Sequence, residues 1–308
     1  MMDERLTSTN RSHRTSELEV PASSAAVTGL SANQAMPFSG AAIGQQIDRQ
    51  CPVGLVAEGA NIADQGAGLF PDEAAEVRHS PRSRQAEFST ARACARRALA
   101  RLGGPQVSLP VGRHRAPEWP QDYVGSLSHC ADVAVALVAE AARFAGAGID
   151  IETISAVPET LVERIATADE RIMLTQLDRD ESSIPWGLLL FSAKESVYKC
   201  CYQTTGHRIS FRDISIRVNA DGSLHAWPAG ARSASRDGLT SGTEGLWTVA
   251  GTHVITAVWQ QTDTNDEVEG IRSRAALSPW YCGGSDFSRM PSPSVGFVRS
   301  RPSRNDCW

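Results

Sequence analysis

The segment from Pro185 to Gly206 constrains the fold most, because it carries the clearest helical pattern in the chain. Pro185 suits the start of a helix and Gly206 suits its end. Apolar residues at three- and four-residue spacing form one stripe: Trp186, Leu189, Leu190, Ala193, Val197, Cys200 and Cys201. We therefore predict an amphipathic helix with one buried side.

Glu195 and Lys199 lie off that stripe, one helical turn apart, with Lys194 beside them. Most carboxylate–ammonium pairs at this spacing are solvated surface pairs, and each contributes only ~0.2–0.5 kcal/mol to helix stability. The alternative is that this pair does chemistry, and the rest of the chain must decide between the two interpretations.

The chain has 308 residues and a net charge of −5, which allows one large domain or two smaller ones. Mild acidity argues against a dedicated nucleic-acid binder, since such proteins are usually basic. The stretch from Arg78 to Arg115, by contrast, is rich in arginine and forms a basic patch suited to phosphate.

The seven cysteines include no Cys-x-x-Cys pair, which argues against a thiolate zinc site. Their odd number and a charged N-terminus without a signal peptide favour a reducing, cytoplasmic setting. The longest apolar run, around Val133–Ala142, is far shorter than the ~20 residues of a membrane span. We therefore expect a cytoplasmic monomer that binds neither membrane nor nucleic acid.

A strong helix is predicted over Ser83–Leu102, with Phe88 and Leu99 on its buried face. Five arginines cover the rest of it: Arg84, Arg92, Arg96, Arg97 and Arg101. Each could belong to a solvated helix face. So many arginines in an acidic chain nevertheless favour an anion site.

Two predicted strands carry polar residues of interest. His129 follows small residues at the mouth of one strand, where it is either an ordinary hydrogen-bonded residue or a phosphate contact. In Gly148–Glu152, Asp150 and Glu152 share one strand face, about 7 Å apart. Two such carboxylates repel each other unless a cation lies between them, and magnesium fits this ligand type. The alternative is an exposed acidic strand edge.

The remaining segments give a provisional division of the chain. Residues 1–50 and 263–308 are predicted to be disordered, because they are polar and lack periodicity. Residues 51–149 would form an N-terminal half and residues 150–262 a C-terminal half. Pro158–Leu177 has helical character. A strand is predicted over 211–218, followed by three strands of an antiparallel meander: 223–227, 245–250 and 252–259.

Three stretches in this order carry a resemblance to a known family: Gly125–Cys130, Gly148–Glu152 and Phe191–Lys199. The sequence resembles the 4′-phosphopantetheinyl transferases of the enterobactin-synthetase and surfactin-synthetase type, and most of all their actinobacterial siderophore and mycolate branch. The resemblance covers roughly Cys51 to Trp259. It also includes Leu69-Phe70-Pro71 and Ala116-Pro117-Glu118-Trp119-Pro120.

The resemblance implies a pseudo-twofold α/β fold, with two similar halves and an active site in the cleft between them. It also implies transfer of the phosphopantetheine arm of coenzyme A to a serine of an apo acyl or peptidyl carrier protein. Adenosine 3′,5′-bisphosphate would be released.

The site residues follow from the same resemblance. Asp150, Glu152 and Glu195 would hold Mg²⁺, one of them partly through water, and Glu195 or such a water would take the serine proton. Lys199 would contact a pyrophosphate oxygen, and Lys194 would support the site or touch a phosphate at its rim.

Coenzyme A contacts are assigned by the resemblance to Arg84, Arg92, Ser128 and His129. Family members often carry a lysine in the loop that here reads Leu109–Arg115, so Arg113 or Arg115 would replace it.

Two other functions compete with this one. A non-catalytic module for coenzyme A or carrier proteins would keep the fold without turnover, although the retained acids and Lys199 argue against it. A metal-dependent phosphohydrolase could use the same carboxylates.

Overall fold

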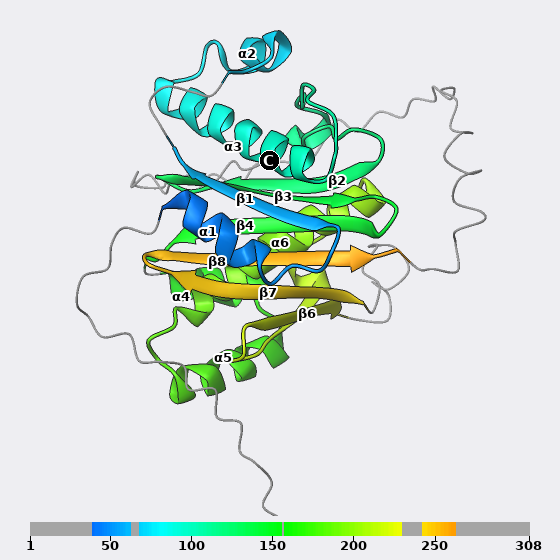
Figure 1. The fold of residues 1–308 in the computed structure, drawn as a ribbon. Helices are drawn as coiled ribbons and strands as arrows, with labels where there is room; N and C mark the ends of the chain where they lie inside the picture. The colour runs from blue at the N-terminus through cyan, green and yellow to red at the C-terminus, as the bar shows by residue number, and fades with distance from the viewer. Residues whose placement is uncertain (1–38, 63–67, 156, 230–241, 263–308) are drawn as a thin grey trace, which may run out of the picture. The chain divides into compact units, whose positions relative to one another are not determined.

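Two long helices, each packed on an antiparallel sheet, organise the fold (Figure 1). The computed structural model describes residues 39–62, 68–155, 157–229 and 242–262, and these all fall in one compact unit. The predicted disorder of residues 1–38 and 263–308 lies outside the described residues. Mixed helices and antiparallel sheets confirm the predicted α/β class.

The first sheet has three strands in the order β1-β3-β2. These are β1 (Leu55–Asn61), β2 (Tyr123–His129) and β3 (Val133–Glu140). Alternate residues of β3 enter two different cores, as expected for a strand buried on both faces. Helix α3 (Arg82–Arg101) packs on one face, which confirms the helix predicted there, and the short helix α2 (Pro71–Val77) precedes it.

The second sheet has five strands in the order β4-β8-β7-β6-β5. Strand β4 is Phe144–Thr153, and the others are β5 (Ile214–Val218), β6 (Ser223–Pro228), β7 (Thr243–Ala250) and β8 (His253–Gln261). Strands β6, β7 and β8 form the predicted meander, and β5 extends it by pairing with β6. Strand β5 begins later than predicted because residues 211–213 form a 3₁₀ turn, η2 (Phe211–Asp213).

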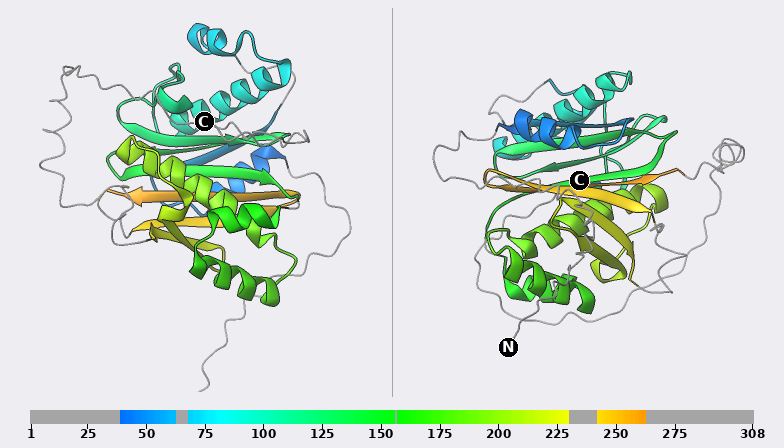
Figure 2. Two further views of the ribbon diagram at one scale, coloured as in Figure 1. Left: turned by 180° about the vertical axis from the view of Figure 1, so that it is seen from behind. Right: turned by 60° about the horizontal axis from the view of Figure 1, so that its bottom comes forward.

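Helix α6 (Trp186–Thr205) lies across the second sheet, as seen from behind in Figure 2. Every residue of the predicted apolar stripe is buried, and Gly206 ends the helix with a positive φ of 68°. The helix backbone rests directly on β4 at Gly148, where an added Cβ would lie 1.9 Å from the Ser196 carbonyl oxygen. Because of this close approach, the side of α6 that faces β4 is buried as well as the apolar stripe.

The segment predicted as helical over Pro158–Leu177 contains two helices, α4 (Glu159–Ile165) and α5 (Ala168–Asp180). A capping box separates them: the Glu170 backbone N–H donates to the Thr167 hydroxyl, and the Thr167 N–H donates to the Glu170 carboxylate.

The predicted division of the chain was wrong at two places. Helix α1 (Gly40–Asp48) lies within the segment 1–50 that was expected to be disordered. Its Ile43 and Ile47 are fully buried in a core that both sheets share, which supplies the order that its composition did not indicate. The boundary between residues 149 and 150 falls inside strand β4, so it does not separate two halves.

Candidate active site

Helix α6 places the Lys199 ammonium directly against Asp150 of β4. The Lys199 Nζ atom lies 2.8 Å from Asp150 Oδ1 and also donates to the Ser128 hydroxyl (3.2 Å) and the Ile149 carbonyl (3.1 Å). The Ser128 hydroxyl donates to the same Asp150 oxygen at 2.9 Å. Lys199 has no exposed surface, so its ammonium compensates the buried charge of Asp150. Its predicted contact with a pyrophosphate oxygen stays a prediction.

The second oxygen of Asp150 is a buried acceptor with no hydrogen-bond partner among the residues that the structure describes. Glu152 shares its strand face and is 8% exposed, whereas Ile149 and Ile151 point into the core on the other face. The predicted alternation along this strand is therefore confirmed. A buried carboxylate oxygen without a donor is costly unless a cation occupies the place of the donor.

Glu195 completes the group of acids from α6. Burial raises the pKa of its carboxyl to about 7; Lys199 lowers the pKa and Asp150 raises it. Lys199 acts on Glu195 from one turn further along α6, and Asp150 acts on it from β4. A carboxyl with a pKa near neutral can both take and release a proton at physiological pH.

The three acids do not form a closed ligand cluster. Within the described ranges, one group of three metal-ligating side chains has all its ligand atoms within 4.8 Å of one another, and it does not include Asp150, Glu152 or Glu195. The predicted magnesium site would therefore need water or a side-chain movement to join these carboxylates.

A pocket lies between α3 and the end of β2. Its lining residues are Arg84, Phe88, Ala91, Arg92, Leu127, Ser128 and His129. Arg92 is 1% exposed, stacks over the Phe88 ring at 4.3 Å and donates from Nε to the Leu109 carbonyl at 2.8 Å. Its Nη2 atom is buried without a hydrogen-bond partner in the described part of the chain. A buried guanidinium with a spare donor fits an anionic oxygen.

His129 contributes to this pocket as a neutral group. Burial, Arg84 and Lys199 lower the pKa of its imidazole to about 4. The Arg84 guanidinium lies 2.7 Å from Nε2, which therefore acts as the acceptor. At neutral pH the positive charge of the pocket comes from Arg84 and Arg92.

Three other arginines of α3 have structural roles, so the helix is not a uniform anion-binding or solvated face. Arg96 is buried and forms two contacts with the Glu73 carboxylate, at 2.8 and 3.0 Å. Arg97 pairs with Glu58, and Arg101 with Glu58 and Asp48, which ties the helix to β1 and α1. The two predicted coenzyme A contacts on this helix, Arg84 and Arg92, are the arginines that line the pocket.

Of the two predicted roles of Lys194, the structure places the side chain in the supporting one and not at a phosphate. Its ammonium is fully buried, lies 2.8 Å from Glu170 of α5 and donates to the Phe211 and Ile214 carbonyls. Burial lowers the pKa of this ammonium and Glu170 raises it. The side chain holds α5 and β5 against α6.

Lys194→Met should lower the free energy of unfolding by about 3–5 kcal/mol, because Glu170 would stay buried without its cation. Urea unfolding measures this loss. The double variant Lys194→Met/Glu170→Gln should recover at least half of it, and equal losses in both variants would contradict the structural role.

Arg115 lies on the exposed loop that contains the 3₁₀ turn η1 (Arg113–Arg115). His114 and Arg115 have positive φ angles of 56° and 67°, an uncommon conformation for residues other than glycine. The Tyr202 hydroxyl of α6 donates to the Arg113 carbonyl at 3.2 Å. The loop is thus fastened to the helix that carries Lys199, and either arginine remains a candidate phosphate contact.

Gln203 is a positioning residue that no sequence pattern indicated. Its side chain accepts from the Gly125 N–H of β2 at 3.0 Å and donates to the Ala147 carbonyl of β4 at 2.6 Å. Strands β2 and β4 belong to different sheets, so this amide bridges them beside the Asp150–Ser128 contact.

The comparisons with known proteins agree with this geometry. The model of the 4′-phosphopantetheinyl transferase N-terminal domain matches residues 72–139, and the model of the 4′-phosphopantetheinyl transferase superfamily matches residues 146–238. A structure titled holo-ACP-synthase from Plasmodium yoelii overlaps 39% of this chain and 97% of its own, at 15% identity and a TM-score of 0.32, too low to support an argument.

Three curated relatives come from actinobacteria. The 4′-phosphopantetheinyl transferase Svp of Streptomyces mobaraensis is 39% identical over 62% of this chain and 78% of its own length. Npt of Nocardia iowensis is 34% identical, with 61% and 87% covered. PptT of Mycobacterium tuberculosis is also 34% identical, with 63% and 86% covered. Matches of this identity and coverage place the chain in the 4′-phosphopantetheinyl transferase superfamily, as an enzyme of that class.

Proposed function

We propose that this enzyme transfers the 4′-phosphopantetheine arm of coenzyme A to a serine of an apo acyl or peptidyl carrier protein, with Mg²⁺ as cofactor. The observation that carries the proposal is the juxtaposition of a buried acidic group on β4 and α6 with a pocket that holds a buried, partly unsatisfied Arg92. Relatives named enterobactin synthase component D make a carrier in siderophore synthesis one candidate substrate.

The acidic residues suit a hard, oxygen-preferring cation. Asp150 offers a buried oxygen without a donor, and Glu195 and Glu152 lie on elements that adjoin it. These are the ligands we propose for Mg²⁺, with water completing the set. When bound, the ion would neutralise pyrophosphate charge and act as a Lewis acid.

The protein side chains would then divide the chemistry among them. Glu195 in its carboxylate form would accept the proton of the carrier serine, directly or through a water. The serine oxygen would attack the β-phosphorus, and the phosphoanhydride bond to the adenosine side would break, which gives adenosine 3′,5′-bisphosphate. Lys199 would keep Asp150 charged and oriented throughout, because its ammonium is already bonded to Oδ1.

The pocket beside α3 would hold the adenosine end of coenzyme A. Arg92 would give its spare Nη2 donor to a phosphate oxygen, and Arg84 would add a second positive charge. We assign the 3′-phosphate to this pocket, because its two guanidinium groups and a neutral imidazole match a compact dianion.

Arg92→Gln should raise the KM for coenzyme A about 10–100-fold, since a charge-assisted hydrogen bond to phosphate is lost. The same substitution should change the KM for 3′-dephospho-coenzyme A at most about twofold. Steady-state transfer assays with both substrates measure the difference. An equal loss for both substrates would place the 3′-phosphate elsewhere.

The proposed reaction is tested by mass spectrometry of an apo carrier protein incubated with the enzyme and coenzyme A. One phosphopantetheine should be added per carrier, and none to a carrier whose serine is replaced by alanine. Chelation should stop the gain and Mg²⁺ should restore it. Release of adenosine 3′,5′-bisphosphate without carrier would indicate a phosphohydrolase, and binding of coenzyme A without turnover would indicate a non-catalytic module.

A further inference from the structure

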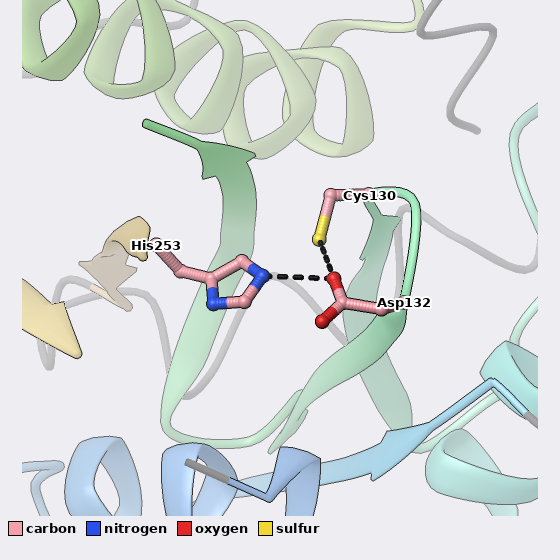
Figure 3. Close-up of side chains that lie close together, drawn as sticks. All are labelled: Cys130, Asp132 and His253. Atoms are coloured by element: carbon pink, nitrogen blue, oxygen red, sulfur yellow. Dashed lines mark hydrogen bonds and ion pairs between the residues drawn. The ribbon is translucent and has the colours of Figure 1, made fainter. Parts of the chain in front are cut away.

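Cys130, Asp132 and His253 form a compact cluster outside the proposed transferase site (Figure 3). Their ligand atoms all lie within 4.8 Å of one another. Asp132 Oδ1 is 2.9 Å from His253 Nε2 and 3.5 Å from the Cys130 sulfur. We propose that this cluster is a second metal site, which binds Zn²⁺ or a similar borderline-soft divalent ion.

The chemistry of the ligands favours zinc over magnesium. A thiolate and an imidazole are typical zinc ligands, whereas magnesium prefers oxygen alone. In a tetrahedral zinc site, usual bond lengths give about 3.5 Å between sulfur and oxygen ligands and about 3.3 Å between oxygen and nitrogen ligands. The observed 3.5 and 2.9 Å require only a small opening between Asp132 and His253.

The ligands are carried by two tight turns, which hold them in place. Cys130 and Asp132 belong to the β2–β3 turn, which is closed by a bond from the Cys130 N–H to the Val133 carbonyl. His253 begins β8 directly after the β7–β8 turn and pairs with Thr153 of β4. The contact of Nε2 with Asp132 orients the His253 ring. Nδ1 of the same ring is buried without a hydrogen-bond partner among the residues described.

Solvent can also reach the cluster, so an ion could enter and leave it. Cys130 and His253 are 7% and 3% exposed, whereas the Asp132 side chain is 58% exposed and leaves a route from solvent. Three protein ligands leave a fourth position open for water, whereas structural zinc sites are closed by four protein ligands. The ion would link the β2–β3 turn of the first sheet to β8 of the second.

A Co²⁺ titration of the full-length chain tests the site, with excess Mg²⁺ present to occupy oxygen ligands. Cys282 and Cys307, which lie outside the described residues, are first replaced by serine so that they cannot bind the metal. We expect one equivalent of Co²⁺ with a thiolate-to-cobalt charge-transfer band, displaced by Zn²⁺. Zinc at about 100 times its Kd should raise the Tm by roughly 5 °C.

The variants identify the ligands. Cys130→Ser should abolish the charge-transfer band. Asp132→Asn and His253→Gln should each weaken Co²⁺ binding at least tenfold. The matched controls Cys51→Ser and His207→Gln should leave Co²⁺ binding unchanged. Asp132→Asn alters an exposed side chain, so it remains informative if a buried variant fails to fold. Absence of the band in the folded protein, or equal binding by Cys130→Ser, would overturn the proposal. The titration requires no turnover, so it can fail while the proposed transfer reaction stands.

Discussion

Glu195→Gln should lower kcat/KM for transfer to a carrier at least about 10³-fold, because glutamine can neither accept the serine proton nor offer an anionic ligand. The fold should persist, since the amide resembles the protonated carboxyl that the surroundings favour. Glu163→Gln, on the exposed face of α4, is the matched control and should leave the rate unchanged. Near wild-type transfer by Glu195→Gln would contradict the role of Glu195.

Glu195→Gln should also change how the free energy of unfolding depends on pH. The pKa of Glu195 is raised to about 7 by burial, so its folded state holds a proton that the unfolded state releases. The protonated Glu195 carboxyl therefore stabilises the folded state fully at a pH below its unfolded pKa. This stabilisation is lost as the pH rises through the folded pKa of about 7. At pH 8, Glu195→Gln should therefore unfold with a free energy about 1–3 kcal/mol higher than wild type. Urea unfolding at pH 5 and pH 8 measures the change.

The activity of wild type should rise with pH through about 7 when Mg²⁺ is limiting, as Glu195 loses its proton. Saturating Mg²⁺ should move this rise to lower pH, because a nearby cation favours the carboxylate. A pH profile that is independent of Mg²⁺ would argue against Glu195 as a ligand.

Lys199→Met should have the second large effect, on stability and catalysis together. It leaves the Asp150 carboxylate buried without its ammonium, which should cost about 3–5 kcal/mol of unfolding free energy. Transfer should fall at least about 10²-fold, since Asp150 loses its charge and orientation.

The double variant Lys199→Met/Asp150→Asn separates the two effects. Because it buries no unpaired charge, it should recover most of the lost stability, as denaturant unfolding would measure, while transfer stays low. Recovery of transfer along with stability would show that the pair is structural only.

Local sequence patterns predicted the elements that carry the site. The three- and four-residue spacing of α6 and the alternation of β4 are properties of single segments, and both place Asp150, Glu195 and Lys199 correctly on their elements. What these patterns lack is the packing of one element on another. The contact of Gly148 with the Ser196 carbonyl, which sets the Asp150–Lys199 distance, joins residues that are far apart in the chain.

The errors share the same cause. Lys194 lies beside Glu195 in sequence, yet its partner Glu170 comes from another helix on a different side of α6. Helix α1 is a short segment with two glycines and two glutamines, and its burial against both sheets orders it. The grouping of Cys130, Asp132 and His253 is equally invisible in local patterns, because His253 lies 121 residues beyond Asp132.

Within the described part of the chain, no helix is long and apolar enough to cross a bilayer. The expected cytoplasmic location and monomeric state remain predictions. Gel filtration with light scattering would test the second of these directly.

Phosphopantetheine transfer by the β4–α6 acids can be tested by measuring both reaction products in one assay. Wild-type enzyme and Glu195→Gln are incubated in parallel with coenzyme A, Mg²⁺ and an apo carrier. For wild type we expect one adenosine 3′,5′-bisphosphate for each phosphopantetheine gained on the carrier serine, and for Glu195→Gln we expect neither product. Full modification of the carrier by Glu195→Gln, or bisphosphate release by wild type with an unmodified carrier, would contradict it.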